Sequence, residues 1–308
     1  MEKLPLMINF SVLFVGGLIT IILYGFLVCN WRSNRHGLNT LLLISLFYQT
    51  VYSIFGVMHA AYCILALLFR FEPNGDVMFW TAMPMYTLRM VLPLSSLFQA
   101  LDRLVATRFP MLYRSAVFGK LGITAGLATA ALAVVNIAIY IWERKTSNFS
   151  PFIFSQYVNP VVVYALSDVH NGLCVLNIIA AVVFLKCFVD FVRLQRQTRS
   201  LTSEQFRNIN TTNLMVFYQL LAEFVVKVIP SFATSIARYA YQVNWPQHIG
   251  PYVIAIQVIY TAICSITYTW KMRVCKSVRT KNPVLLNSST NCAVSSLNGH
   301  RVSINSFM

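Results

Sequence analysis

Charged residues are scarce in this chain of 308 residues, and acidic residues are the scarcest. Only 11% of the residues are charged, with 9 Asp and Glu against 24 Lys and Arg, whereas 57% are hydrophobic. A soluble domain needs a more polar surface than this, so the composition predicts an integral membrane protein. The net charge of +15 does not indicate nucleic-acid binding, because nucleic-acid-binding folds are not interleaved with apolar runs of about 20 residues.

Patterns typical of catalysis and metal binding are also missing. The five histidines are scattered, and the seven cysteines lie mostly inside apolar runs without the spacing of a metal site. The sequence has no Gly-rich phosphate loop, no nucleophile elbow and no pair of buried carboxylates. We therefore expect no enzyme activity, no cofactor and no metal site. No internal repeat of the kind found in transporters with paired halves is present either.

Seven apolar segments are long enough to cross a bilayer, which predicts an all-α bundle of seven transmembrane helices. The spans are expected at Ile8–Cys29, Leu38–Phe69, Val77–Leu101, Leu121–Trp142, Leu173–Val192, Thr211–Ala233 and Ile249–Trp270. The bundle would occupy residues 1–281, and a disordered cytoplasmic tail residues 282–308. The 14 apolar residues Ile153–Leu166 reach only about 21 Å as a helix, so we expect residues 143–172 to form an outer loop folded onto the bundle.

The distribution of Lys and Arg predicts the orientation of the chain. Most of them fall in the segments that lie inside if the N-terminus is outside. The sequon at Asn148 then lies outside and is expected to be glycosylated, whereas those at Asn210 and Asn287 lie inside. Cys275 follows the seventh span in a basic patch, which allows either palmitoylation or a free thiol.

Three charged residues lie well inside predicted spans: Arg89 in the third, and Glu223 and Lys227 in the sixth. Such charges are costly in a membrane and are therefore functional candidates. If all three face the interior, their net positive charge suits an anionic ligand such as a carboxylate. Alternatively, Glu223 neutralises one or both cations and the trio only fixes helix register, or the trio acts in a coupling switch. Residues expected to line the same cavity are Tyr86 and Tyr260, with Phe98, Gln99, Tyr218 and Gln219 as further candidates.

The third span ends in Asp102-Arg103, and a basic stretch up to Pro110 follows. An adjacent acid and base can pair with each other in one state and release the Arg to a partner in another. The alternative is an ordinary Arg-rich inner boundary. In the sixth span, Pro230 is expected to kink the helix because it removes a backbone hydrogen bond, either as a moving part or as a static bend.

The seven spans, the outer N-terminus, the short loops and the pattern Asp102-Arg103…Ala106…Pro110 resemble the architecture of rhodopsin-like G-protein-coupled receptors. The sequence differs from that family at other positions. Gly25 stands where that family usually has Asn, and Gln49 lies near its usual Asp.

Tyr268 in the seventh span is kept without the preceding Asn-Pro, and no cysteine is placed for the usual disulfide to the second outer loop. This combination is similar to nematode serpentine chemoreceptors, with class BC as the best match. The resemblance implies a receptor in the plasma membrane, or the ciliary membrane of a sensory neuron. Such a receptor detects small environmental molecules or pheromones, alone or with another receptor, and activates a heterotrimeric G protein.

By this resemblance Asp102 and Arg103 form an inner lock, and Pro110, Pro230 and Tyr268 belong to the coupling switch. A carrier or channel in which the buried charges line a permeation path is the alternative reading. The sequence disfavours it, because the charges stop in the predicted outer half and no pair of broken helices is evident.

Overall fold

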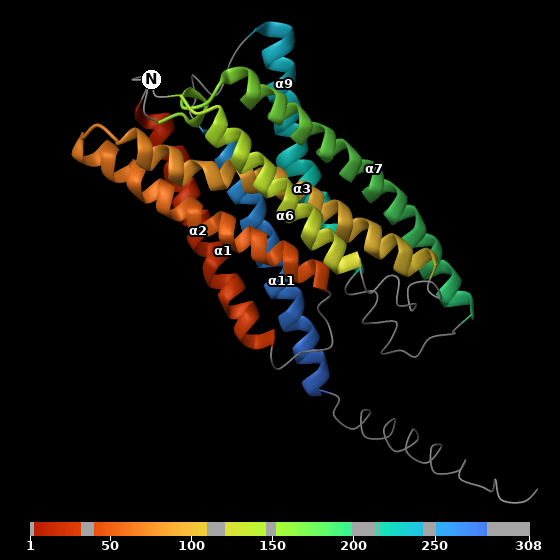
Figure 1. Cartoon of the computed structure of the whole chain (residues 1–308). Helices are drawn as coiled ribbons and strands as arrows, with labels where there is room; N and C mark the ends of the chain where they lie inside the picture. The colour runs from red at the N-terminus through yellow and green to blue at the C-terminus, as the bar shows by residue number, and fades with distance from the viewer. Residues whose placement is uncertain are drawn as a thin grey trace, which may run out of the picture. The chain divides into compact units, whose positions relative to one another are not determined.

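The computed structural model describes residues 3–31, 40–109, 121–145, 152–198, 213–214, 216–242 and 251–281. Within these residues the long elements are all helices, as predicted (Figure 1). They are α1 (Lys3–Trp31), α2 (Thr40–Phe69), α3 (Gly75–Arg108), α6 (Leu121–Trp142), α7 (Pro160–Thr198), the π-helix η2 (Phe224–Val228), α9 (Ile229–Tyr241) and α11 (Tyr252–Lys281), with a short 3-10 helix η1 (Phe154–Gln156). The elements η2 and α9 belong to one apolar helical run, Val216–Tyr241.

The chain divides into two compact units, residues 1–267 and 268–308. All helix packing reported below lies within the first unit. Of the second unit, the structure describes residues 268–281, which form the C-terminal end of α11. The predicted end of the receptor domain at residue 281 stays a prediction, because residues 282–308 lie outside the described part of the chain.

Six of the described helices are long and apolar enough to cross a membrane. The seventh, α3, has 34 residues, or about 51 Å of helix, so its length also suffices. Its apolar character is interrupted by Arg89 and by the pair Asp102-Arg103. A helix can carry such residues in a membrane when neighbouring helices cover it, and α3 packs against α2, α6 and α7 (Figure 1).

Several helix boundaries differ from the prediction, among them the end of α3 and the start of α7. Helix α3 runs on to Arg108, so Asp102 and Arg103 are helical residues and not the start of a loop. Helix α7 begins at Pro160 and not at Leu173. Its start follows ordinary capping chemistry: the Asn159 side chain accepts a hydrogen bond from the backbone N–H of Val161 at 3.3 Å, and proline is favoured at the first helical position. The expected outer loop is therefore shorter, because its apolar second half belongs to α7.

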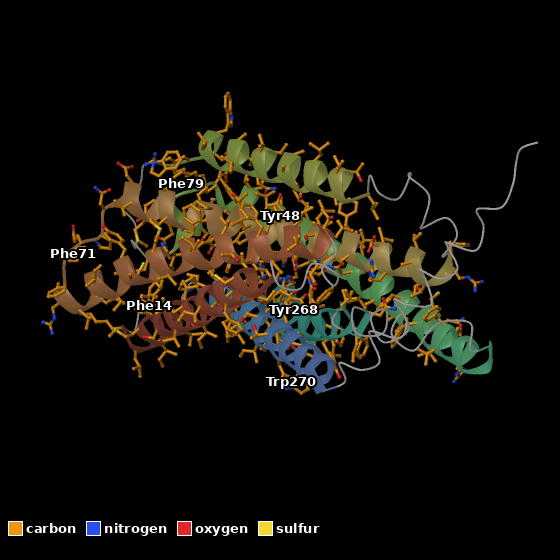
Figure 2. All side chains as sticks on the ribbon, turned by 90° about the horizontal axis from the view of Figure 1, so that it is seen from below. Phe14, Tyr48, Phe71, Phe79, Tyr268 and Trp270 are labelled. Carbon is orange, nitrogen blue, oxygen red and sulfur yellow. The ribbon has the colours of Figure 1, made fainter. Side chains whose placement is uncertain are left out.

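The described part of this loop is folded onto the bundle, as predicted. The ring of Phe154 stacks on Tyr86, with 4.4 Å between ring centroids, and meets Tyr140 edge-on at 5.3 Å. Phe154 also stacks on Phe79 at 5.7 Å, and Figure 2 labels Phe79 on its helix. Aromatic contacts of this kind favour a fixed position of the loop over the end of α3.

An ion pair ties the loop to α3. Arg144 pairs with Asp76 in the first turn of α3, and its guanidinium lies 4.7 Å from the centroid of the Phe79 ring. The backbone of Arg144 also forms an isolated antiparallel bridge with Val158. The cysteines Cys63 and Cys174 are buried free thiols, so neither provides a disulfide for the loop.

The close approach of α1 and α2 depends on Gly17. A Cβ atom at this position would lie 2.7 Å from Val57 Cγ2 and 3.2 Å from the carbonyl oxygen of Ser53. A backbone atom cannot give way as a side chain does, so a larger residue would push the helices apart. Closer to the C-terminal end of α1, the hydroxyl of Tyr24 donates to the side-chain oxygen of Gln49, and both residues are buried.

Candidate functional site

Glu223 and Lys227 form a deeply buried ion pair. Lys227 Nζ lies 2.9 Å from Glu223 Oε1, and the side chains are only 3% and 2% exposed. Asn177 on α7 donates from Nδ2 to the same Glu223 oxygen at 3.3 Å. Lys227 Nζ also lies 4.7 Å from the centroid of the Tyr260 ring, a cation–π contact. Glu223 therefore neutralises Lys227. This agrees with the alternative interpretation of the sequence, in which Glu223 neutralises one or both of the cations.

The turn between these two residues is a π-helix, Phe224–Val228. The N–H of Ile229 donates to the carbonyl oxygen of Phe224, five residues earlier. Pro230 follows, has no N–H and would clash with the carbonyl four residues before it in a regular α-helix. The distortion expected from Pro230 thus takes the form of a widened turn. Such π-turns are frequent at functional sites.

Arg89 on α3 is the third of the charged residues predicted inside a span, and it is half-buried. Its guanidinium forms no ion pair with any carboxylate among the described residues. It lines a cavity of about 80 Å³ that we call the arginine cavity. The lining residues are Tyr86, Arg89, Ile153, Ser155, Val163, Tyr164, Ser167, Ser231, Thr234, Ser235, Arg238, Pro251 and Val253.

The arginine cavity is rich in hydrogen-bonding groups and positive charge. Two of its thirteen lining residues are arginines, seven carry a hydroxyl group and none is a carboxylic acid. Arg238 is oriented by Asp168, which lies 2.7 Å away, and its guanidinium lies 4.8 Å from the centroid of the Tyr164 ring. The charge of Arg238 is thus compensated from outside the cavity, whereas no carboxylate in the described ranges compensates that of Arg89.

A smaller cavity of about 10 Å³ adjoins the arginine cavity. Its lining residues are Arg89, His170, Lys227, Pro230, Ser231, Thr234, Tyr252, Val253, Ile256 and Gln257. The two cavities share Arg89, Ser231, Thr234 and Val253. The volume corresponds to roughly one water molecule. Arg89 and Lys227 therefore lie at a similar level in the bundle, as their sequence positions predict.

The other predicted pocket residues separate into two groups. Tyr86 lines the arginine cavity, whereas Tyr260 is fully buried against Lys227 and lines neither of these two cavities. The remaining candidates make helix contacts or face outward: Gln99 donates to the carbonyl oxygen of Leu41, Gln219 donates to Ser96, and Tyr218 is 37% exposed.

Sequence reasoning missed Arg238 and the hydroxyl residues. Arg238 falls outside the predicted sixth span, which ends at Ala233, but it lies on α9, which extends to Tyr241. A signal was present: Ser231, Thr234 and Ser235 recur at helical spacing on one face of the same span. Ser231 and Ser235 bond to Asn171 on α7, at 2.6 and 2.9 Å.

The second predicted site lies towards the C-terminal end of α3. Arg103 Nε donates to Asp102 Oδ2 at 2.8 Å, and an Nη nitrogen donates to the same oxygen. The two side chains are 11% and 5% exposed. The structure thus has the pair in its closed, mutually bonded arrangement.

The roles of several other residues stay predictions. Pro110 and the glycosylation candidate Asn148 lie outside the described residues. Cys275, the palmitoylation candidate, lies in α11, and its side chain is outside the described part. Tyr268 is a helical residue at the start of the second unit.

Residues 3–119 match the family described as Serpentine type 7TM GPCR chemoreceptor Srbc. The matched stretch contains α1, α2 and α3, and with them Arg89 and the pair Asp102-Arg103. No curated protein matches the chain.

Proposed function

We propose that this multi-pass membrane protein, whose residues 3–119 match the family of serpentine seven-transmembrane GPCR chemoreceptors called Srbc, is a chemoreceptor of class BC that detects a small anionic molecule. The ligand binds in the arginine cavity, and its binding activates a heterotrimeric G protein at the opposite end of the bundle. The receptor lies in the plasma membrane of a sensory cell, or its ciliary membrane, with the N-terminus outside.

The unpaired guanidinium of Arg89 is the observation that carries this proposal. A cation among packed helices is costly unless an anion or a set of acceptors surrounds it. No described carboxylate fills that role for Arg89. A ligand carboxylate would pair with its planar fork through two parallel hydrogen bonds. The hydroxyl groups of the cavity would bind the remaining polar atoms of the ligand.

Lys227 has a different role in this proposal. Its charge is balanced by Glu223 and its ammonium faces the Tyr260 ring, so it has less to offer to an anion than Arg89. It still lines the small cavity beside Arg89. Ligand binding next to this cavity would therefore act on the turn that contains Lys227 and Pro230.

Helix α3 offers a direct connection to the G-protein side. Arg89 and Arg103 lie on the same helix, and 14 residues of helix correspond to about 21 Å. A ligand that binds one arrangement of α3 more tightly shifts the population towards it. In that arrangement Arg103 leaves Asp102 and contacts the G protein.

The proposal is tested by comparing acids with their neutral derivatives in cells that report G-protein activation. Small carboxylic acids should activate the receptor, and their methyl esters should be at least about tenfold less potent. Arg89→Gln should lower the potency of an active acid by a similar factor, and Arg89→Lys by less. Lys186→Gln removes an exposed cation on α7 that lines neither cavity, so it serves as the matched control and should leave the potency unchanged.

Surface expression is measured for every variant. Equal potency of acid and ester, or unchanged potency in Arg89→Gln, would refute the ligand assignment. An acid-evoked current or uptake without nucleotide exchange would favour the carrier or channel reading instead. An N-terminal tag that antibodies reach on intact cells would support the proposed orientation.

A further inference from the structure

A second, larger cavity lies between α7 and the helical run Val216–Val228. Its volume is about 200 Å³, and we call it the lateral groove. The lining residues are Cys174, Asn177, Ile178, Ala181, Val182, Leu185, Phe217, Leu220, Leu221, Glu223, Phe224 and Val228. It shares no lining residue with the arginine cavity.

The walls of the lateral groove are apolar and open to the outside of the bundle. Val182 is 62% exposed and Leu221 47%, one on each wall. Both belong to helices that are long and apolar enough to span a membrane. In a bilayer these exposed side chains contact lipid, so the lateral groove is reached from the lipid and not from water.

Two residues that line this apolar groove, Glu223 and Asn177, carry buried acceptor atoms. Among the described residues Glu223 Oε2 and Asn177 Oδ1 have no hydrogen-bond partner, and both residues are only 2% exposed. A buried acceptor without a donor is costly, and each such group in a structure requires an explanation. Two unsatisfied acceptors that line one cavity point to a donor supplied by a ligand.

The orientation of both groups is fixed by their other atoms. Asn177 Nδ2 donates to the carbonyl oxygen of Pro93 at 2.9 Å and to Glu223 Oε1 at 3.3 Å. Both partners are acceptors, so a flipped amide would break two hydrogen bonds. Lys227 bonds to Glu223 Oε1 as well. The oxygens Oε2 and Oδ1 are therefore the groups left over for a ligand.

We propose that the lateral groove binds a neutral, lipid-soluble molecule whose polar end is a hydrogen-bond donor, such as a long-chain alcohol or primary amide. A cationic head is disfavoured because Lys227 already balances the Glu223 charge. An anionic head would be repelled by the two acceptor oxygens. The apolar walls accept the hydrocarbon part of the molecule.

This site is independent of the proposed anion site, but its occupant would contact a distorted turn. Phe224 and Val228, which line the lateral groove, are the first and last residues of the π-helix. The occupant would therefore stabilise one hydrogen-bonding arrangement of the turn between Glu223 and Lys227. This gives the lateral groove a means to modulate the receptor.

The experiment uses the full chain in lipid nanodiscs and a photoreactive long-chain alcohol. Crosslinked peptides are identified by mass spectrometry. We expect saturable labelling of α7 and of the run Val216–Val228. The matched methyl ether, which has no donor, should label these peptides about tenfold less. The photoreactive primary amide should label them like the alcohol.

Two variants locate the site. Ala181→Phe should fill the groove and remove labelling, whereas Ile179→Trp should leave it unchanged, because Ile179 is exposed on the same helix and does not line the groove. The comparison of alcohol with ether needs no variant, so it holds even if Ala181→Phe fails to fold. Equal labelling by alcohol and ether, or labelling outside these helices only, would overturn the proposal. Either result would mean that Glu223 Oε2 and Asn177 Oδ1 bind water or no partner.

Discussion

The helical run Val216–Tyr241 carries two ion pairs whose geometry is similar and whose surroundings differ. Lys227 and Glu223 lie 2.9 Å apart on one helix, with side chains 3% and 2% exposed. Arg238 and Asp168 lie 2.7 Å apart and join α9 to α7, with side chains 18% and 43% exposed. Water can replace a lost partner only in the second pair. We therefore expect the same kind of substitution to be severe in the first pair and mild in the second.

The largest effect is expected from breaking the buried pair on one side. Lys227→Met leaves the Glu223 carboxylate buried without a counter-charge, which should cost about 3–5 kcal/mol of stability. The double variant Glu223→Gln with Lys227→Met should recover most of this loss, because no charge is left unpaired. For both variants, the thermal unfolding midpoint in detergent and the surface expression are measured.

Lys186→Met is the matched control for that experiment. Lys186 is exposed on α7, so this variant should unfold at nearly the temperature of the unmodified receptor. If Lys227→Met were as stable as Lys186→Met, the ion pair would not be a structural element of the bundle.

The pair Asp102-Arg103 should give the next largest change, because its burial is intermediate. Arg103→Ala should abolish ligand-evoked nucleotide exchange on a reconstituted G protein while surface expression is kept. Asp102→Asn weakens charged hydrogen bonds worth about 1.5–3 kcal/mol and should raise basal exchange by freeing Arg103. Unchanged exchange in both variants would argue against a lock at this position.

A purely steric change calibrates these electrostatic effects. Gly17→Leu introduces atoms against Val57 and the Ser53 carbonyl oxygen, so it should cost about 1–3 kcal/mol. Gly25→Leu on the same helix is the control, since a Cβ at Gly25 meets no heavy atom within 4 Å. Equal unfolding temperatures of the two variants would contradict the close approach of α1 and α2.

The smallest effect is expected at the exposed pair. Arg238 donates to Asp168 Oδ1 and the Tyr239 hydroxyl donates to Asp168 Oδ2, each at 2.7 Å. Asp168→Asn removes the charge but keeps one acceptor oxygen, so one of these two hydrogen bonds can remain. The change in stability should stay below about 1 kcal/mol. A loss as large as that of Lys227→Met would mean that burial does not separate the two pairs.

The helices were predictable because their signals are local. Apolar length marks each span, and α6 has the bounds that the sequence predicts. The start of α7 was missed, although Asn159 and Pro160 form a capping signal that can be read from the sequence. The apolar stretch up to Leu166 is too short to cross a bilayer by itself, but the helix that contains it continues to Thr198.

The candidate site was predictable only in part. The cost of a charge inside a span singled out Arg89, Glu223 and Lys227, and the spacing of four residues favoured the pair that the structure contains. Neither signal revealed which cation Glu223 would leave unpaired. Arg238 escaped notice because its distance from Arg89 along the chain gives no sign that both line one cavity.

The sequence by itself determined that the chain is a bundle of membrane-spanning helices with charges in its interior, because length, hydropathy and spacing are properties of local segments. Only the tertiary structure decided that Arg89 has no carboxylate partner within the described part of the chain. It also decided that α7 and the run Val216–Val228 leave an apolar groove lined by two residues whose acceptor atoms find no donor there. Both features arise where helices distant in sequence meet, and their packing, not their composition, sets which polar groups find partners.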